Sequence, residues 1–227
     1  MRTPSPPPAP SRPPAPSRPP AFTVGFDLDM TLIDSRPGIK AVYEALVAET
    51  GVYVDTDLVT SRLGPPVESE LANWFPADRV AALGDRYRAL YPDHGITPTT
   101  ALPGAAAALT AVRAAGGRAL VVTAKSRPLA ELHLDHLGLA PGAVVGGLWA
   151  DAKATALTEY EASAYVGDHV GDVAGARAAR VLSVAVATGP CPPAELRAAG
   201  ADVVLPDLRA FPEWLSGWLS GAGAPGP

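Results

Sequence analysis

The chain contains little cysteine and no long apolar run, and each shortage excludes a class of protein. Its single cysteine, Cys191, cannot form a disulfide within the chain, which excludes a small scaffold held together by disulfides. No apolar stretch approaches the roughly 20 residues that a membrane-spanning helix needs. The first residues also lack the apolar segment of a secretory signal peptide. We therefore expect a cytoplasmic protein that has no membrane partner.

Lysine is scarce as well, and positive charge as a whole is in deficit. Only Lys40, Lys125 and Lys153 occur among 18 basic residues, against 23 acidic ones. Three of the arginines fall within residues 1–20, where there is no acidic side chain, so the remainder of the chain is more acidic still. A nucleic-acid-binding surface needs a basic patch, and this composition argues against a nucleic-acid partner.

Proline is concentrated at the N-terminus. Ten prolines fall within residues 1–20, where Ala-Pro-Ser-Arg-Pro-Pro occurs twice in succession. Such a segment cannot bury apolar surface, so we expect a disordered tail there and a second, short flexible tail over residues 222–227. The chain as a whole is 48% hydrophobic, which is enough for one sizeable core with a small accessory domain.

Three apolar runs, at residues 22–26, 118–122 and 162–166, predict buried strands. Polar residues follow each run directly; they are Asp27 and Asp29, Thr123 and Lys125, and Asp168 and Asp172. In an extended chain residues i and i+2 point to the same side, so the first two carboxylates would face one small volume. Two carboxylates so placed are typical of a metal site or of an acid/base pair.

Lys153 adds a cation to this pattern. It begins a helical stretch over residues 151–160, just after an apolar run at residues 143–149 that predicts a further strand. Parallel strands place their carboxyl ends at one edge of a sheet, so all these polar groups would meet at a single site.

The segment between the first two predicted strands is helical. Apolar residues recur at helical spacing over residues 37–49, 67–75 and 78–90, and no strand is predicted between Asp34 and Thr97. We therefore expect a helical cap over residues 36–96, inserted into a core made of residues 21–35 and 97–221. Helices and strands alternate in that core, which predicts an α/β fold with a parallel sheet covered on both faces.

The ordered motifs, Asp27-x-Asp29-x-Thr31, Thr123, Lys153 and Gly167-Asp168-x-x-x-Asp172, resemble those of the haloacid dehalogenase (HAD) superfamily. The resemblance covers about residues 22–206. It implies a HAD-like Rossmannoid core with a small C1-type helical cap, as in subfamily I. Members of this superfamily are mostly Mg²⁺-dependent phosphatases.

The resemblance also implies roles for the motif residues. Asp27 would be the nucleophile that forms an aspartyl phosphate, and Asp29 would protonate the leaving oxygen and later activate water. Mg²⁺ would be held by Asp27, by the backbone carbonyl of Asp29 and by Asp168. Thr123 would hold the phosphoryl oxygens, and Lys153 would offset the negative charge of Asp27 and the phosphate. Asp172 would pair with Lys153 or orient a metal-bound water.

Three branches of the superfamily can be weighed from the residues. Dehalogenases lack the second carboxylate, which is present here as Asp29, and phosphonatases use a cap lysine, for which only Lys40 is available. β-Phosphoglucomutases carry Gly-x-Ser-Arg in a cap loop, whereas this chain has Gly64-Pro65-Pro66-Val67-Glu68 without the cation. The leading hypothesis is a phosphatase of small phosphomonoesters, similar to phosphoglycolate phosphatases. The alternatives are a phosphomutase of that type and a non-catalytic phosphate-responsive module similar to receiver domains.

The cap is expected to face the substrate through Arg62, Gly64 and Glu68. Lys125 is expected to contact the substrate or to pair with an acidic neighbour, and both interpretations stay open. His169 is expected either to reach the site or, as the preferred interpretation, to face solvent, and His133 with His136 is expected to lie on a helix surface. The leaving group stays open among glycolate, nucleotide, sugar and pyrophosphate, and the oligomeric state is not predicted.

Overall fold

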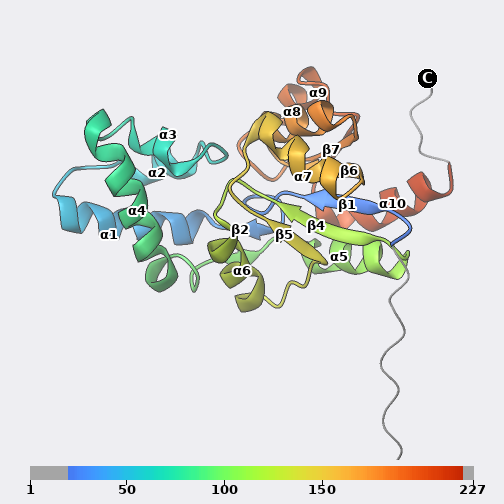
Figure 1. Cartoon of the computed structure of the whole chain (residues 1–227), viewed down its shortest axis with the longest axis horizontal. Coiled ribbons are helices and arrows are strands. Elements are labelled where there is room, and N and C mark those ends of the chain that lie inside the picture. The colour runs from blue at the N-terminus through green and yellow to red at the C-terminus, as the bar shows by residue number, and fades with distance from the viewer. Residues whose placement is uncertain (1–19, 222–227) are drawn as a thin grey trace, which may run out of the picture.

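The computed structural model describes residues 20–221, so the predicted tails, residues 1–20 and 222–227, lie outside it apart from Pro20. Its centre is a six-stranded parallel sheet in the order β5-β4-β1-β6-β7-β8 (Figure 1). The strands are β1 (Thr23–Phe26), β4 (Arg118–Val122), β5 (Ala143–Val145), β6 (Ala162–Gly167), β7 (Leu182–Val186) and β8 (Val203–Leu205). The predicted α/β fold is confirmed, and β1 lies in the interior of the sheet, between β4 and β6.

Helices cover both faces of this sheet, because its strands are apolar on both sides. One face packs on α5 (Ala105–Ala114), α6 (Arg127–His136) and α10 (Phe211–Leu219). The other packs on α7 (Lys153–Glu159), α8 (Val170–Ala179) and α9 (Pro193–Ala198). The side chains alternate with the period of a strand: Ala164 and Val166 face the first layer, and Tyr165 faces the second. No helix of the described part of the chain is long and apolar enough to cross a membrane.

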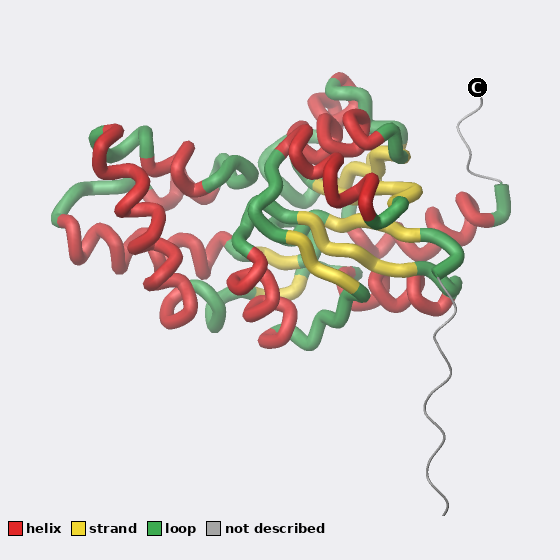
Figure 2. Tube along the Cα trace, viewed as in Figure 1, coloured by secondary structure: helices red, strands yellow, loops and turns green. Residues whose placement is uncertain are grey.

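Four helices are inserted between β1 and the rest of the sheet, and we call residues 36–94 the helical insertion. They are α1 (Arg36–Thr50), α2 (Thr56–Thr60), α3 (Val67–Leu71) and α4 (Ala77–His94). They share a separate apolar core, in which Val42, Leu46 and Tyr91 are among the most deeply buried side chains. Figures 1 and 2 show this group beside the sheet, at the end where the polar residues after β1 lie.

The chain enters and leaves the helical insertion through a two-stranded antiparallel ribbon. Its strands are β2 (Ile33–Asp34) and β3 (Thr100–Ala101), with Ile33 opposite Ala101 and Asp34 opposite Thr100. The two crossings between sheet and insertion therefore lie side by side.

Several predicted boundaries differ from the structure. The strand expected over residues 143–149 ends at Val145, because Gly146 and Gly147 follow it and the chain then turns toward Lys153. The helix expected over residues 67–75 ends at Leu71. Two short helices, α2 and α9, were not predicted, because five or six residues are too few to show a helical period.

Candidate active site

The polar residues after three neighbouring strands meet at the carboxyl edge of the sheet. Asp27 follows β1, Thr123 follows β4 and Asp168 follows β6. All three are buried, at 8%, 1% and 3% exposure respectively. Because β1 pairs in parallel with both β4 and β6, the three strand ends deliver these side chains to one place.

Lys153 is the central cation of this cluster. It is the first residue of α7 and only 1% exposed. Its Nζ donates to Asp27 Oδ1 at 2.8 Å and to Asp172 Oδ1 at 2.6 Å. It also donates to the hydroxyl of Tyr165 at 2.8 Å, and that hydroxyl donates in turn to the Val122 carbonyl at 2.7 Å. The ammonium is thus held between two carboxylates.

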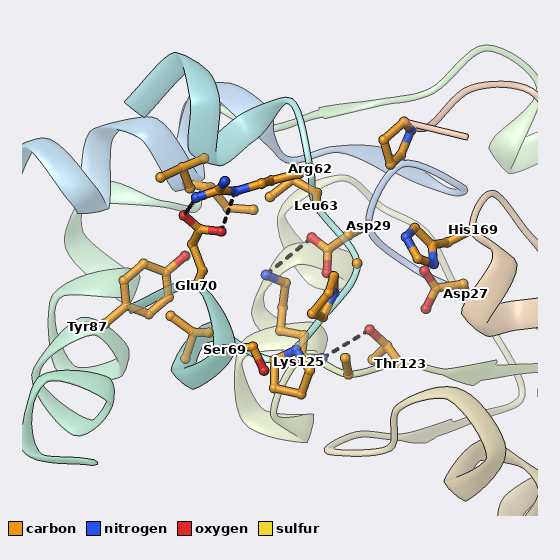
Figure 3. A pocket seen from close by; sticks show the side chains of 18 of the residues that line it. Asp27, Asp29, Arg62, Leu63, Ser69, Glu70, Tyr87, Thr123, Lys125 and His169 are labelled. Carbon is orange, nitrogen blue, oxygen red and sulfur yellow. Dashed lines mark hydrogen bonds and ion pairs between the residues drawn. The ribbon is translucent and has the colours of Figure 1, made fainter. Parts of the chain in front are cut away.

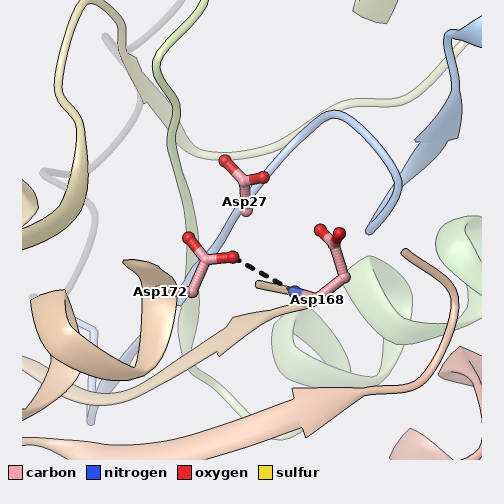
Figure 4. A group of neighbouring side chains, drawn as sticks. All are labelled: Asp27, Asp168 and Asp172. Carbon is pink, nitrogen blue, oxygen red and sulfur yellow. Dashed lines mark hydrogen bonds between the residues drawn. The ribbon is translucent and has the colours of Figure 1, made fainter. Parts of the chain in front are cut away.

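Asp172 and Asp168 are fixed by contacts of different kinds (Figure 4). Asp172 Oδ2 accepts the backbone N–H groups of Asp168 and His169, both at 3.1 Å, in the first turn of α8. Asp168 Oδ1 accepts the Thr31 hydroxyl at 2.8 Å. A Cβ added at Gly189 would come within 1.7 Å of Asp168 Oδ2, so the backbone at Gly189 must approach this carboxylate closely. Among the described residues, the Asp168 carboxylate therefore accepts one hydrogen bond, from Thr31, and has no ion-pair partner.

The carboxylates of this cluster carry more negative charge than the protein itself balances. Oxygens of Asp27, Asp168 and Asp172 lie within 4.8 Å of one another. Burial, only partly offset by Lys153 and reinforced by Asp172, raises the pKa of Asp27 to about 7. Burial together with the charges of Asp172 and Asp27 raises the pKa of Asp168 well above its ordinary value. Burial lowers the pKa of Lys153, but Asp172 and Asp27 override it and leave that pKa raised.

This donor set fits a divalent cation. Buried carboxylate oxygens are the ligands that hard cations such as Mg²⁺ prefer, and a bound cation would let all three carboxylates ionise together. Asp168 has no cationic partner in the described part of the chain, so a bound divalent cation would stabilise its ionised form most.

A second ion pair lies beside this cluster. Lys125 Nζ is 3.2 Å from Asp29 Oδ1, and it donates to the Tyr91 hydroxyl of α4 at 2.9 Å. Of the two interpretations left open for Lys125, pairing with an acidic neighbour is therefore observed. Burial alone would raise the pKa of Asp29, but the charge of Lys125, aided by the nearby Ser35 hydroxyl, leaves that pKa below its ordinary value. Asp29 is thus held in its ionised form.

The expectation that His133 lies on the surface is wrong. Its side chain is 0% exposed, and its Nε2 lies 3.2 Å from the hydroxyl of Tyr91, which reaches it from the helical insertion. Nδ1 is buried without a partner. Burial and the nearby charge of Lys125 lower the pKa of His133 to about 4, so the ring is neutral at ordinary pH. The other histidine of the pair, His136, is exposed as expected.

A cavity of about 520 Å³ separates the sheet edge from the helical insertion. Asp27, Asp29, Thr123 and Lys125 line it from the core. In Figure 3, Asp27 and His169 lie at one side, Arg62 and Glu70 of the insertion at the other, and Asp29 with Lys125 between them. His169 is half-buried, packs against Trp149 at 5.1 Å between ring centroids and lines this cavity. Of the two interpretations left open for His169, reaching the site is therefore observed, and the preferred one, that it faces solvent, is wrong.

The three cap residues expected to face the substrate have different positions. Arg62 and Gly64 line the cavity, but Glu68 does not; it forms an ion pair with Arg88. Gly64 has φ of 142°, and a Cβ there would come within 2.9 Å of His169, so a side chain would be strained and crowded. Lys40, the remaining lysine, pairs with Asp57 at 2.6 Å and lies outside this cavity.

Four contributing residues were not recognised from the sequence: Tyr91, Tyr165, Glu70 and Cys191, of which all but Tyr165 line the cavity. Tyr165 lies within a predicted strand, and its alternation with Ala164 and Val166 could have placed it on the face that carries Lys153. Nothing in the sequence marks the other three, because their positions depend on how separate elements pack.

Comparisons with known proteins agree with this architecture. A family model described as haloacid dehalogenase-like hydrolase matches residues 24–177. Phosphoglycolate phosphatase from Chromobacterium violaceum is 30% identical over 192 residues, which are 73% of this chain and 85% of that protein. Phosphoglycolate phosphatase from Cereibacter sphaeroides is 34% identical over 176 residues, 69% of this chain and 80% of its own. The crystal structure of a predicted phosphatase from Clostridium acetobutylicum superposes with a TM-score of 0.76 at 25% identity, covering 86% of this chain and 98% of that one.

Proposed function

This chain belongs to the haloacid dehalogenase-like hydrolases and is a phosphatase, and from that premise we propose that it hydrolyses a small phosphomonoester through a phosphorylated Asp27, with Mg²⁺ as cofactor. The observation that carries the proposal is the placement of Asp27. Its carboxylate is paired with Lys153, lies within the acidic cluster and lines a cavity that can admit a substrate. The candidate leaving groups are glycolate, to which the names of the relatives point, a nucleoside and a sugar.

In the first step, a carboxylate oxygen of Asp27 attacks phosphorus, and the bond from phosphorus to the leaving oxygen breaks. The leaving oxygen takes a proton from Asp29, which must therefore be protonated when the substrate is bound. Lys125 holds Asp29 ionised in the free protein, so the approach of a phosphate dianion, which raises the pKa of a neighbouring carboxylate, is needed to load that proton.

In the second step, water attacks the phosphorus of phosphorylated Asp27, Asp29 takes a proton from that water, and inorganic phosphate leaves. The Lys125 ion pair favours the ionised form of Asp29 that this step needs. Asp27 regains its carboxylate, and Asp29 releases the proton that it has taken as phosphate leaves, so the site returns to the free state in which Lys125 holds Asp29 ionised.

The other residues at this edge of the sheet are proposed to hold the phosphoryl group and to neutralise its charge. The Lys153 ammonium offsets the charge of Asp27 as the phosphoryl group approaches, and Asp172 fixes that ammonium. Thr123 is proposed to hold a phosphoryl oxygen. Mg²⁺ held by Asp27, Asp168 and the Asp29 backbone carbonyl would supply charge neutralisation at the phosphoryl oxygens.

We also propose a division of labour along the chain. Residues 21–35 and 97–221 form the core that carries the chemistry, and residues 36–96 form a cap that excludes water and contacts the leaving group. Tyr91 of α4 is consistent with a cap that lies against the site, since its hydroxyl contacts Lys125 and His133 of the core directly.

A phosphate-release assay tests the proposal. Alkyl and aryl phosphomonoesters would be supplied with Mg²⁺ and after chelation, and the acid-quenched protein would be analysed by mass spectrometry for phosphate on Asp27. We expect turnover only with metal and a phosphorylated peptide that contains residue 27. Asp57→Asn, which removes an exposed carboxylate outside the cavity, is the matched control and should turn over normally. Turnover without a phosphorylated Asp27 in rapidly quenched samples would contradict the covalent route.

A further inference from the structure

We infer that this enzyme favours phosphomonoesters whose leaving group carries no negative charge of its own. The inference rests on the proposed function and narrows its substrate class. It depends on the charged side chains that line the cavity away from Asp27, and on which of them already have partners.

Each basic side chain that the helical insertion contributes to the described lining of the cavity is already neutralised by the protein. Arg62 is paired with Glu70, and Arg88 with Glu68. No cation on this side of the cavity is therefore free to receive a carboxylate or a second phosphate on the leaving group. Glu195, which also lines the cavity and is exposed, adds further negative charge.

The pair of Arg62 and Glu70 is held firmly in place. Arg62 donates through Nε at 2.8 Å and through Nη2 at 2.6 Å to the two oxygens of Glu70, which is the bidentate geometry of the stronger ion pairs. Trp74 donates its indole N–H to the same carboxylate at 2.7 Å. Glu70 is only 15% exposed, so a substrate carboxylate would have to displace a carboxylate that accepts three hydrogen bonds.

The guanidinium nevertheless keeps donors for a neutral partner. Glu70 takes up Nε and one N–H of Nη2, which leaves Nη1 and the second N–H of Nη2 to donate. These donors lie on an ion pair with no net charge, so they suit a hydroxyl or carbonyl oxygen. A leaving-group anion placed there would instead meet the nearby carboxylate of Glu70, and like charges at close range are unfavourable. The rest of the wall is largely apolar, with Ile39, Tyr43, Val59 and Leu129 among its residues.

The prediction differs from what the phosphoglycolate phosphatase relatives suggest. Phosphoglycolate carries a carboxylate on the carbon next to its ester oxygen. A site that favoured it would need a cation free to pair with that carboxylate. The described lining of this cavity offers Arg62 as a hydrogen-bond donor whose charge is already balanced.

Two matched pairs of substrates test the inference on the full-length enzyme with Mg²⁺. One pair is 2-phosphoglycolate and 2-hydroxyethyl phosphate, and the other is 3-phosphoglycerate and glycerol 1-phosphate; within each pair a carboxylate replaces a hydroxymethyl group. We expect kcat/KM to be about 10-fold or more higher for the neutral member of each pair, the size expected for one unpaired buried charge. p-Nitrophenyl phosphate serves as a reference for phosphatase activity as such.

Releasing a cation should weaken or remove this preference. Glu70→Gln removes the charge that neutralises Arg62, so the ratio of kcat/KM for the charged to the neutral member should rise by about 10-fold. Glu68→Gln releases Arg88 in the same way and provides an independent variant if the first does not fold. The matched control is Glu49→Gln, which breaks a comparable bidentate pair with Arg86 outside the cavity. It should leave both ratios as they are in the wild type.

The outcomes separate the inference from the proposed function. Turnover of p-nitrophenyl phosphate together with a wild-type preference for the carboxylate esters would overturn the inference and leave the function standing. An unchanged ratio in both Glu70→Gln and Glu68→Gln would also overturn it. Absence of turnover on every ester, p-nitrophenyl phosphate included, would instead contradict the proposed function.

Discussion

The two sides of the cavity handle charge in opposite ways. On the core side, Asp27, Asp168 and Asp172 are buried together and share one ammonium, that of Lys153, so negative charge is left unbalanced. On the side of the helical insertion, Arg62 and Arg88 are each matched by a glutamate. The core side is thus incomplete without a cation and a phosphoryl group, whereas the insertion side is electrostatically complete.

This difference in charge balance predicts different functions for the two sides of the cavity. Unbalanced buried charge raises the free energy of the free protein and is tolerated where a ligand restores the balance. Side chains whose charges are balanced can shape a cavity and donate hydrogen bonds without attracting ions. We therefore expect changes on the core side to abolish chemistry or metal binding, and changes on the insertion side to redistribute preference among substrates. Three predictions test the core side of this contrast, and a fourth tests the contact between the two sides.

The largest effect is expected from Asp27→Asn. The amide cannot attack phosphorus, and it cannot replace an ionised carboxylate at a metal. Turnover should fall by more than about 10⁴-fold, the order of loss found when a covalent nucleophile is removed. Circular dichroism should show the fold unchanged, because the amide can still accept the Lys153 ammonium through its carbonyl oxygen. If a substantial fraction of the turnover survived, Asp27 would not be the nucleophile.

Asp29→Ala should come next, with a loss of about 10² to 10⁴-fold on alkyl phosphates, which is the usual contribution of a general acid or base. The loss in the first step should shrink with p-nitrophenyl phosphate, because p-nitrophenolate leaves without needing a proton. Burst kinetics on the two esters would separate the steps. Equal losses in the first step on both esters would rule against proton transfer by Asp29.

Metal binding should stabilise the protein through the core side alone. At a Mg²⁺ concentration about 100 times its dissociation constant, the free energy of unfolding should rise by about 2.7 kcal/mol. Asp168→Asn should lose most of this gain in a thermal denaturation experiment, and NaCl at equal ionic strength should not reproduce it. The same gain in wild type and Asp168→Asn would place the ion elsewhere.

His133, at the contact between the two sides, should make the protein sensitive to acid. The folded protein keeps its ring neutral down to about pH 4, whereas in the unfolded chain it takes up a proton near pH 6.5, so the unfolded state binds more protons between these values. Stability should therefore fall as the pH is lowered from about 6.5 to 4, by about 1 to 3 kcal/mol from this residue. Denaturant titrations should show a shallower fall in His133→Leu.

His136→Leu, on the exposed side of the same helix, is the matched control for that experiment. It should show the same fall in stability as the wild type. The explanation would fail if His133→Leu and the wild type lost stability in parallel over this range.

The sequence predicted the core side of the site because its residues follow a general rule of parallel sheets. Asp27, Thr123 and Asp168 each follow an apolar strand, and the carboxyl ends of such strands share an edge. Lys153 was placed by the same rule, although the strand before it ends at Val145 and a turn carries the chain to the lysine. The rule needs no knowledge of side-chain packing.

The insertion side could not be predicted to the same extent. Glu68 and Glu70 lie two positions apart on the same short helix, α3. Only the packing of α3 against α4 and against the turn after α2 decides that Glu68 meets Arg88 while Glu70 meets Arg62. His133 has a histidine three positions away on its helix, which suggests a polar face, yet Tyr91 from a distant helix covers it. Contacts of this kind depend on three-dimensional packing, which leaves no local pattern in the sequence.

The ribbon of β2 and β3 gives the molecule a modular construction. Because its two strands bring the ends of the helical insertion together, any segment whose ends lie equally close could connect to the core at the same place. Asp27, Lys153 and Asp168 lie outside the exchanged segment. Substrate preference can therefore diversify in descendants or in engineered chimaeras while the reaction chemistry is inherited unchanged.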